Sequence, residues 1–574
     1  MGVIHPIESY WLYWGTEEMT GGIRREMDDK FEKLIEWLLY GLIDFDFISE
    51  SLLPELNEET SIKNSSLKVG EMKYDVIVVP NCVTIRETTL SRLKKFVKYG
   101  GKVIFTGGTP KLVDAVPSES PMELMKNCRN IGFDRYELLN ALEEYRDIDI
   151  RNELGIRTNN IIYQLRKDGE NEWLFLAHVN KMSNPDIPKK EELTITIKGT
   201  WKAIIYDAVT GKTRECKCEY SRDNTILFQT MFEHDSLLLK LVKTDLAVNV
   251  TREDMNEDYI EGKASMEITV PSEVSITLSE PNVYLLDLAE YRFDEENWQP
   301  REEILRIDNL FRKKLGYPLR MEAFAQPWVD EKEEGYEHKL SLRFEVFSDV
   351  AIQTAKLALE NPEITNVSVN GIKAEKTIDG WYTDRDIKTI ILPELFAGRN
   401  EIIVEILYNS RTNIEAMYLL GDFGVKVSGS NQKIISPMNK IGFGDITSQG
   451  LPFYGGNITY NLEIETMEGD LTIQVSQFRN PVIKVLLDGE EKGYIAYSPY
   501  ILQMKDVKEG VHKLQIVTYG NRVNTFGTIH NCNKTESWIG PNAWRTTGTS
   551  WAYEYQLKPT GILISPQIRL RKHI

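Results

Sequence analysis

The first residues of the sequence combine side chains that could bind a sugar. The stretch HPIESYWLYWG, residues 5–15, contains His5, Glu8, Trp11 and Trp14. Carboxylate and imidazole groups form hydrogen bonds with hydroxyls, and indole rings stack on the C–H faces of sugar rings. This composition predicts a carbohydrate-binding surface at these four side chains, in a segment that begins as a short buried strand.

A second segment, IDFDFISE (residues 43–50), supplies further carboxylates. Alternation along an extended chain places Asp44 and Asp46 on one side and two phenylalanines on the other. Sugar hydrolysis usually needs two carboxyl groups about 5–10 Å apart, one of them kept protonated. Asp46 and Glu50 are therefore candidates for carbohydrate contact, although a half-exposed strand with capping acids has the same pattern.

A third cluster lies near the C-terminus, in ESWIGPNAWRTTGTSWAYEYQL (residues 536–557). Trp544 and Trp551 are its candidate sugar-binding residues, since aromatic rings beside asparagine and arginine match both the faces and the hydroxyls of a sugar. Core packing in a β-sandwich also explains tryptophans in such a segment, so both interpretations stay open.

Other kinds of catalytic site have no signal in the sequence. Cys82 follows a strand but lacks the flanking glycines of a nucleophile elbow, and FTGGTP (residues 105–110) lacks the spacing of a phosphate loop. The seven histidines are scattered, so no metal and no cofactor are predicted. A structural calcium ion stays an open alternative, because jelly rolls can hold one through oxygen ligands. The five cysteines form no C-x-x-C pair and are expected to be free thiols.

Length and charge limit the class of protein. A chain of 574 residues exceeds what one core supports, so about three to five domains are expected. The net charge of −19 argues against nucleic acid as a partner, because phosphate binding needs clustered Lys and Arg. Neither a signal peptide nor an apolar run of about 18 residues is present, which predicts a cytoplasmic protein that does not span a membrane.

Apolar periodicity predicts an α/β domain over residues 1–152. GVIHPIE, YDVIVVP and KVIFTGG are typical of buried parallel strands. Helices are predicted from Met27, in TTLSRLKKFVKYGG with its glycine cap, and in DRYELLNALEEY. These segments together predict a small open sheet with helices on both faces.

The rest of the chain is predicted to be mostly strand. Residues 153–245 alternate apolar and polar side chains between turns, which predicts a small antiparallel β-sandwich with a hairpin at DAVTGK. TREDMNEDYIEGK (residues 251–263) is interpreted as a linker. Residues 246–428, with a helix at REEILRIDNLFRKKLG, and residues 429–574 share a weak repeat, an apolar strand running into a turn. They are predicted to be two related jelly-roll sandwiches.

Several motifs carry a family resemblance: YLLGDFGV (418–425), QGLPFYGGNITY (449–460), NVSVNG (366–371) and SPYILQM (498–504). Together they resemble the galactose-binding-like jelly-roll domains of glycoside hydrolase family 2, and the arrangement is similar to the α-L-rhamnosidase-like family 106. VIHPIESYWLYWG, LIDFDFISESLLPEL and YDVIVVPN resemble the α/β domain of those enzymes. That domain is glutaminase-like, an open flavodoxin-type sheet, and is similar to the trimerisation domain of family 42 β-galactosidases.

In these families a catalytic (α/β)₈ barrel precedes the α/β domain and carries the acid and the nucleophile. No position of this chain matches the barrel motifs, so no catalytic residue is predicted. The resemblance implies the non-catalytic, C-terminal portion of a glycoside hydrolase-like protein. It would bind carbohydrate, a barrel-bearing partner, or both. Two alternatives stay open: a self-contained glycosidase for plant or bacterial polysaccharide with its site in the first domain, and a structural assembly module.

The aromatic N-terminal segment also predicts a contact surface. If residues 5–15 normally pack beneath a barrel, they form an exposed aromatic patch in a chain without one, and such patches usually mark interaction sites. Self-association, or binding to a barrel-bearing protein, is therefore expected through residues 5–15 and 44–52.

Overall fold

The chain consists of two compact units, Met1–Glu261 and Gly262–Ile574, each with its own hydrophobic cores. A computed structural model describes residues 1–182, 184–244, 266–320, 335–535 and 540–572. The linker predicted at residues 251–263 lies outside the described residues. Each unit is described below by itself.

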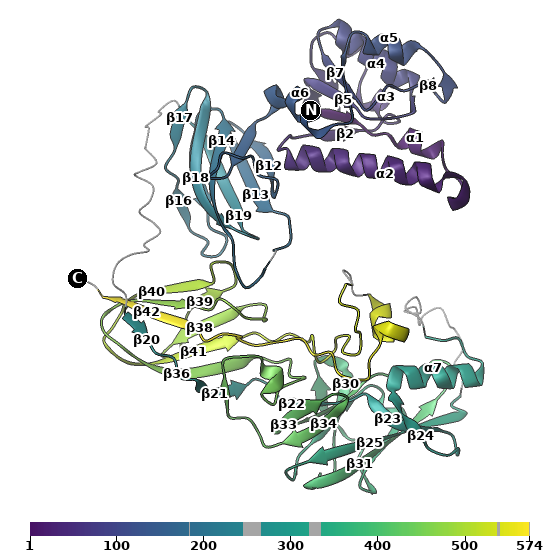
Figure 1. Cartoon of the computed structure of the whole chain (residues 1–574), viewed down its shortest axis with the longest axis vertical. Helices are drawn as coiled ribbons and strands as arrows, with labels where there is room; N and C mark the ends of the chain where they lie inside the picture. The colour runs from purple at the N-terminus through teal and green to yellow at the C-terminus, as the bar shows by residue number, and fades with distance from the viewer. Residues whose placement is uncertain (183, 245–265, 321–334, 536–539, 573–574) are drawn as a thin grey trace. The chain divides into compact units, whose positions relative to one another are not determined.

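The first unit begins with a five-stranded parallel sheet (Figure 1). Its strands are β1 (Gly2–Ile4), β2 (Asp46–Ile48), β5 (Val76–Val79), β7 (Lys102–Thr106) and β10 (Arg129–Ile131). They lie in the order β10-β7-β5-β1-β2, so the winding of the sheet reverses between β1 and β5. Reversal at such a switch point is the mark of a doubly wound α/β sheet. The predicted open α/β sheet is therefore present.

Helices cover both faces of this sheet. They are α1 (Ile7–Trp11), α2 (Glu17–Tyr40), α3 (Leu53–Leu56), α4 (Glu87–Lys98), α5 (Ser120–Met125) and α6 (Arg135–Ala141). Leucines of α2 and α6 pack with Val76 and Val78 on one face, while those of α4 pack with Ile77 and Val79 on the other. Burial on both faces explains why β5 is apolar throughout.

Short strands complete this part of the chain. They are β3 (Leu67–Val69), β4 (Met72–Tyr74), β6 (Thr84–Ile85), β8 (Leu112–Val113) and β9 (Val116–Pro117). Two predicted turns are confirmed. Gly100 ends α4 with a φ of 89°, a left-handed conformation that favours glycine. In the DAVTGK hairpin, Asp207 Oδ1 accepts the N–H groups of Val209 and Thr210, and Gly211 has a φ of 68°.

The predicted strand GVIHPIE, residues 2–8, is present only in its first part. Strand β1 ends at Ile4, and Ile7–Trp11 forms the helix α1 instead. Pro6 has no N–H to donate and stands just before the helix, where that loss costs nothing. Ser9 Oγ accepts the N–H groups of Val83 and Thr84, which ties α1 to the loop after β5. The long helix α2 also starts earlier than predicted, at Glu17.

A small β-sandwich completes the first unit. One sheet contains β11 (Ile148–Arg151), β14 (Lys190–Lys198), β17 (Glu219–Ser221) and β18 (Asn224–Phe232). The other contains β12 (Ile161–Asp168), β13 (Asn171–His178), β15 (Trp201–Tyr206), β16 (Thr213–Glu215) and β19 (Ser236–Lys243). All the pairings within these sheets are antiparallel, and apolar side chains of both sheets form one core.

The second unit contains two sandwiches. The first has a sheet of β22 (Asn282–Leu286), β26 (Lys356–Leu359), β29 (Ile378–Tyr382), β30 (Asp384–Ile391) and β32 (Met417–Gly421). Its second sheet has β23 (Leu288–Phe293), β24 (Gln299–Glu303), β25 (His338–Ser348), β27 (Thr365–Val369), β28 (Ile372–Lys373), β31 (Gly398–Tyr408), β33 (Gly424–Ser428) and β34 (Asn431–Ile435). The predicted helix is present as α7 (Ile304–Leu315), between β24 and β25.

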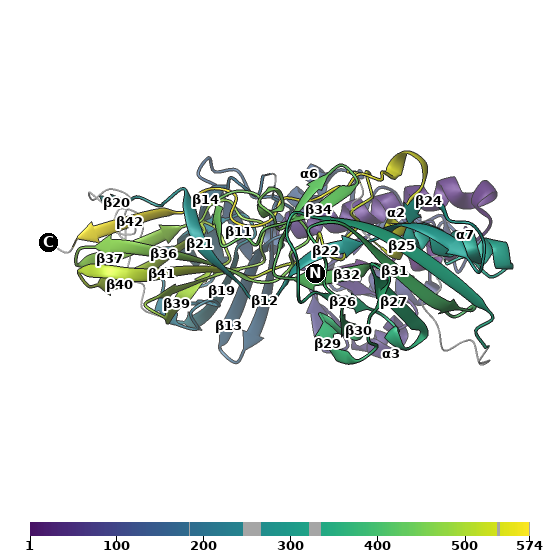
Figure 2. The same ribbon diagram turned by 90° about the horizontal axis from the view of Figure 1, so that it is seen from below.

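The second sandwich is formed by strands from both ends of the unit (Figure 2). One sheet has β20 (Met266–Ile268), β37 (Gly469–Gln474), β40 (Ile501–Val507) and β42 (Gln567–Lys572). The other has β21 (Glu273–Leu278), β35 (Lys440–Gly442), β36 (Ile458–Thr466), β38 (Ile483–Leu487), β39 (Glu490–Ile495) and β41 (Gly510–Thr518). Because β20 and β21 pair with later strands, the first sandwich is inserted within the second.

The chain between β41 and β42 returns to the first sandwich before the second is closed. Ile529 and Tyr555 of this stretch are buried in the core of the first sandwich, where Phe453 also packs. Neither sandwich is therefore one continuous run of residues. We call residues 525–535 and 540–557 the return segment, because residues from both ranges line the cavity described below.

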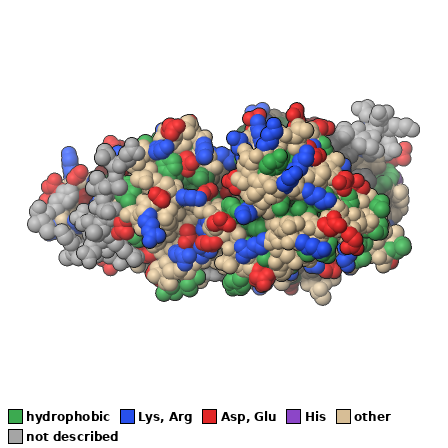
Figure 3. Space-filling model, turned by 90° about the horizontal axis from the view of Figure 1, so that it is seen from above, with side chains coloured by type: hydrophobic (Ala, Val, Ile, Leu, Met, Phe, Trp, Pro, Cys, Tyr) green, Lys and Arg blue, Asp and Glu red, His purple; other side chains and the backbone are tan. Residues whose placement is uncertain are grey.

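Surface and composition add three observations. On the face shown in Figure 3, positive and negative side chains are interspersed, with hydrophobic ones among them. Within the described residues, no helix has both the length and the apolar character needed to cross a membrane. All five cysteines are free.

Candidate functional site

A cavity of about 240 Å³ lies in the second unit, between the first sandwich and the return segment. Acidic side chains from the ends of strands meet aromatic side chains in its lining, Tyr418 from β32 and the others from the return segment. The acidic ones are Asp287, Glu303, Glu360 and Glu415, and the aromatic ones include Tyr418, Phe526, Trp544 and Trp551. Two of the residues predicted from the sequence, Trp544 and Trp551, are thus brought to one cavity.

The two tryptophans differ in their contacts. Trp551 lies against charged neighbours: the ring centroid of His530 is 4.8 Å away and the guanidinium of Arg306 is 4.7 Å from the indole centroid. The Trp544 indole N–H donates to the Phe526 carbonyl at 3.0 Å, which fixes the ring. Trp544 is half-buried and lines the cavity, and no ring-stacking or cation contact to it is found within the described residues.

Strand pairing places Glu360 beside Glu415. Glu360 directly follows β26, and Glu415 comes just before β32, which pairs antiparallel with β26. The end of one strand and the start of the other therefore lie at the same edge of the sheet. Protein atoms around the Glu415 carboxyl desolvate it, although part of the side chain is exposed, and the nearby Glu360 carboxylate adds repulsion. Both effects raise the pKa of Glu415.

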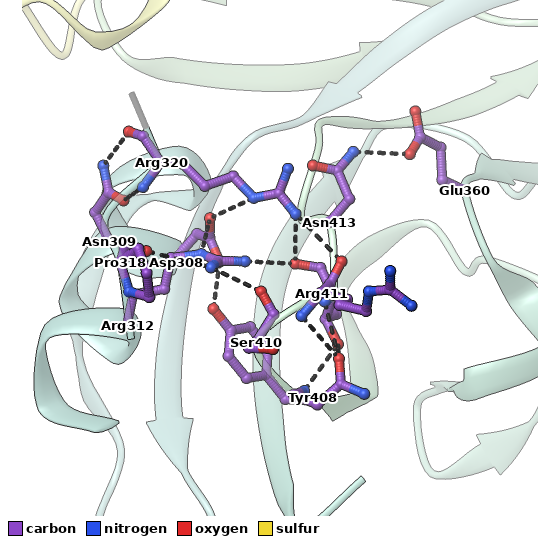
Figure 4. Close-up of polar contacts among 12 residues, drawn as sticks. Asp308, Asn309, Arg312, Pro318, Arg320, Glu360, Tyr408, Ser410, Arg411 and Asn413 are labelled. Atoms are coloured by element: carbon purple, nitrogen blue, oxygen red, sulfur yellow. Dashed lines mark hydrogen bonds and ion pairs between the residues drawn. The ribbon is translucent and has the colours of Figure 1, made fainter. Parts of the chain in front are cut away.

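A buried charge network holds the loop that carries Glu415 (Figure 4). Asp308 of α7 is fully buried, accepts the Tyr408 hydroxyl at 2.5 Å and pairs with Arg312 at 3.2 Å. Arg312 in turn donates to the carbonyl groups of Ser410 and Thr412, both at 2.9 Å. These bonds satisfy the buried charges and fix the loop between β31 and β32.

The same loop orients one of the cavity carboxylates. Asn413 Nδ2 donates to Glu360 Oε2 at 2.9 Å, a contact that Figure 4 shows at the edge of the Asp308 network. The Asn413 amide uses only Oε2 of Glu360. The other carboxylate oxygen can accept a hydrogen bond from a ligand. Glu360 is thus held in place before any ligand binds, which reduces the entropic cost of binding.

A second network joins the return segment to the first sandwich. His530 Nε2 lies 2.9 Å from Asp287 Oδ2, and its Nδ1 lies 2.8 Å from the Ala552 carbonyl. The Tyr555 hydroxyl donates to Asp287 Oδ1 at 2.7 Å, and Gln432 donates to Tyr555. Since both imidazole nitrogens face acceptors, the doubly protonated ring fits best. Burial alone would lower the His530 pKa, but the hydrogen bond and charge of Asp287 raise it.

Glu303 is, after Asp287, the most buried acidic residue in the lining of the cavity. Its side chain is 5% exposed and caps α7, with its two oxygens accepting the N–H groups of Leu305 and Arg306 at 3.0 Å. Desolvation raises the Glu303 pKa to about 8, the capping bonds oppose this, and the Asp287 charge adds to it. Because both oxygens are occupied, Glu303 supports the cavity rather than contacting a ligand.

The cavity therefore combines the indole of Trp544 with two adjacent carboxylates, Glu360 and Glu415. Carboxylates accept hydrogen bonds from hydroxyl groups, and an indole face packs on the C–H groups of a sugar ring. The volume is below the range of about 300–1,000 Å³ typical of drug-sized ligands. The volume of the cavity therefore suits a single sugar ring.

In the first unit, the structure brings Glu8 and Glu50 together on Arg86. Glu8 Oε1 lies 2.9 Å from Arg86 Nε, and the Arg86 backbone N–H donates to Glu50 Oε2 at 2.8 Å. Glu50 is 1% exposed. Desolvation raises its pKa to about 7, partly offset by the Arg86 N–H and increased by the Glu8 charge. This cluster ties the start of α1 to the loop after β2 and to the start of α4.

The other four candidates of the first unit do not join this cluster. His5 packs against the rings of Phe31 and Phe47, with centroids 5.3 and 5.7 Å apart. Asp46 lies at the opposite end of β2 from Glu50 and accepts the Tyr74 hydroxyl at 3.0 Å. Trp11 and Trp14 are 56% and 77% exposed. The eight candidates are thus distributed over several places.

Sequence reasoning missed Asp287, Glu303, Glu360, Glu415 and His530. Each acid stands at a strand end, where an acidic residue is ordinary, and the return of a later segment is what brings them together. His530 lies in the motif RVNTFGTIHN near the C-terminal aromatic cluster, which is the one local signal for it. Among the described residues, no group of three or more His, Cys, Asp or Glu side chains could hold a metal ion.

No family model and no curated protein matches the chain. A rhamnosidase from Novosphingobium sp. PP1Y aligns with 92% of this chain and 36% of its own, at 12% identity and a TM-score of 0.42. An exo-carrageenase GH42 from Bacteroides ovatus aligns with 42% of this chain and 29% of its own, at 13% identity and a TM-score of 0.26. A β-galactosidase from Bacillus circulans sp. alkalophilus aligns with 42% and 41%, at 13% identity and a TM-score of 0.28.

The chain thus spans less than half the length of each of these three enzymes. With TM-scores below 0.5, the likeness is too distant to assign a family or a function. The geometry of the cavity is the observation that bears on function.

Proposed function

We propose that this chain binds carbohydrate through the cavity of its second unit and does not hydrolyse it. The observation that carries this proposal is the meeting of Trp544 with Glu360 and Glu415 in the lining of a cavity of about 240 Å³. Glu303, whose raised pKa would suit a proton donor, has both oxygens engaged in capping α7. Glu415, whose pKa is also raised, lies beside Glu360, so turnover that depends on Glu415 is the outcome that would overturn a purely binding role.

We further propose that the chain is the non-catalytic portion of a glycoside hydrolase-like protein. The motifs YLLGDFGV and QGLPFYGGNITY, which resemble family 2 sugar-binding domains, support this assignment. In this proposal the parallel sheet is a glutaminase-like domain over residues 1–152, followed by a sandwich over 153–245. The two later sandwiches are galactose-binding-like jelly rolls, and a barrel-bearing protein is the partner.

The binding proposal is tested by calorimetric titration of the full chain with a panel of neutral monosaccharides. Trp544→Ala removes the stacking face and is expected to weaken binding at least tenfold, about 1.4 kcal/mol. Glu415→Gln removes a charged acceptor and is expected to weaken binding by a similar factor. Trp14→Ala, an equal truncation on the exposed surface of the first unit, is the matched control and should bind like the unaltered chain.

Two outcomes would contradict the proposal. The first is that no monosaccharide binds at millimolar concentration. The second is that Trp544→Ala, shown by circular dichroism to be folded, binds as tightly as the control. Turnover of nitrophenyl glycosides that disappears in Glu415→Gln would instead overturn the non-catalytic part.

The alternative of a glycosidase site in the first domain has less support. Glu50 is almost completely enclosed, Glu8 is paired with Arg86, and Asp46 lies at the other end of β2. If such a site exists, Glu8→Gln and Asp46→Asn each abolish activity.

A further inference from the structure

A larger cleft, of about 770 Å³, lies in the first unit and plays no part in the function proposed above. The end of α2 and the helix α6 line one side, and loops of the small sandwich line the other. Its lining is rich in side-chain amides: Asn140, Asn152, Asn159, Asn160 and Asn180. Amides both donate and accept, which suits hydroxyl groups.

Ion pairs join the two sides of the cleft. Arg157 Nε lies 2.5 Å from Asp149 Oδ1 in β11, and its second nitrogen lies 2.9 Å from Glu143 Oε1, beside α6. Arg146 pairs with the same Glu143 at 2.9 Å. The partly buried Arg157 therefore connects helix and sandwich directly, so the cleft is largely formed before any ligand arrives.

Backbone contacts orient two of the asparagines. Asn152 Oδ1 accepts the N–H groups of Leu154 and Ile156 at 3.1 and 3.0 Å, and Asn160 Oδ1 accepts the Asn180 N–H at 2.8 Å. Because the carbonyl oxygens are engaged, each amide is fixed with its NH₂ group directed elsewhere. These NH₂ groups form no hydrogen bond to another described residue, so they remain as donors for a ligand.

The charges of the lining largely cancel. Arg157 pairs with Glu143, and Lys189 pairs with Glu191 at 2.8 Å. Arg135, Lys181 and Glu233 also line the cleft, so four cationic and three anionic side chains leave the lining close to neutral, with the amides as its uncharged hydrogen-bonding groups. Tyr136, on α6, is 81% exposed and presents an aromatic ring beside them. Neutral amides next to an open aromatic ring match an uncharged sugar.

We propose that this cleft binds a short, neutral oligosaccharide. The volume of about 770 Å³, compared with about 240 Å³ for the cavity of the second unit, gives room for more than one sugar ring. The site belongs to a different unit and is formed by different residues, so the proposal does not rest on the function proposed for the second unit.

The test is titration of the full chain with neutral tetrasaccharides, namely cellotetraose, xylotetraose, mannotetraose and maltotetraose. At least one is expected to bind, and Tyr136→Ala combined with Asn159→Ala should weaken its binding at least tenfold. Both side chains are exposed, so the variant should fold. Tyr99→Ala, at an exposed tyrosine elsewhere in the first unit, is the matched control and should leave binding unchanged.

A second variant separates this site from the cavity of the second unit. Trp544→Ala should leave tetrasaccharide binding at the cleft intact, whatever its effect on monosaccharides. The proposal is overturned if no tetrasaccharide binds, if the double variant binds as the control does, or if only sulfated or uronic-acid oligosaccharides bind. Loss of tetrasaccharide binding in Trp544→Ala would also overturn it, since binding would then belong to the second unit.

Discussion

Glu50 is an acidic side chain that the fold encloses almost completely. It accepts the Arg86 backbone N–H, while the guanidinium of the same residue pairs with Glu8. Burial raises its pKa from 4.5 to about 7. A carboxyl group with this pKa binds a proton in the folded state at a pH where the unfolded chain has lost it. The folded state is therefore favoured at low pH, and stability declines as pH rises from about 4.5 to about 7.

Replacing Glu50 by Gln is expected to remove this decline. The amide oxygen can still accept the Arg86 N–H, but the side chain cannot ionise. At pH 8 the variant should be more stable than the unaltered chain, by up to about 3 kcal/mol for a pKa difference of this size. At pH 4.5 the two should be nearly equal. Urea unfolding at both pH values measures the difference.

The control for this experiment is Glu55→Gln, at an exposed position of the short helix α3. It should change stability little at either pH. If Glu50→Gln is less stable than the unaltered chain at pH 8, the ionised carboxylate is stabilising and the stated cause of the shift is wrong.

The return segment is the element on which the candidate cavity depends. Its His530 and Tyr555 both bind Asp287, which lies between β22 and β23. A histidine whose folded pKa lies above 6.5 stabilises the folded state fully below pH 6.5. That contribution is lost as pH rises through the folded pKa. The neighbouring Glu303, with its pKa of about 8, shifts stability in the same direction.

Substituting His530 by Gln is expected to weaken the attachment of the return segment most at low pH. Hydrogen exchange of residues 525–535 and 540–557 should be faster than in the unaltered chain at pH 6. The difference should shrink as the pH rises through the raised pKa of His530, because the imidazole loses its charge there. An equal difference at both pH values would show that the charge of His530 plays no part.

At the scale of the whole molecule, one exposed surface has no role in either proposed site. Trp11 and Trp14 are close in sequence to other exposed apolar side chains, Leu12, Met19 and Ile23, between the end of α1 and the start of α2. Contiguous exposed apolar surface usually marks an interaction site. Self-association through residues 5–15 and 44–52 therefore stays a prediction, with a second copy of this chain as the partner.

Light scattering over a range of protein concentrations measures this association. The unaltered chain is expected to increase in mass with concentration, and Trp11→Ser combined with Trp14→Ser should remain a monomer. Trp381→Ser, at an exposed tryptophan of the second unit, is the control and should still associate. The prediction is contradicted if the unaltered chain stays monomeric at every concentration.

The sequence by itself determined the local elements of this protein. Apolar runs and alternation predicted the parallel sheet and the small sandwich, and i, i+3, i+4 spacing predicted the helices, because these patterns depend on residues near one another in the chain. The turns at Gly100 and Asp207 were also predicted, because turn geometry depends on neighbouring residues. The predicted strand GVIHPIE ends at Ile4, and the contacts of Ser9 in α1 with Val83 and Thr84 were the missing information.

Only the tertiary structure decided which distant residues share a site. β20 and β21 cross to a sandwich formed mainly by later strands, and the return segment crosses back. Trp544 was predicted as a sugar-binding residue, but Glu360 and Glu415 became its neighbours through strand pairing and the return of the chain. Such contacts come from burial of apolar surface between segments far apart in sequence, which no local pattern records.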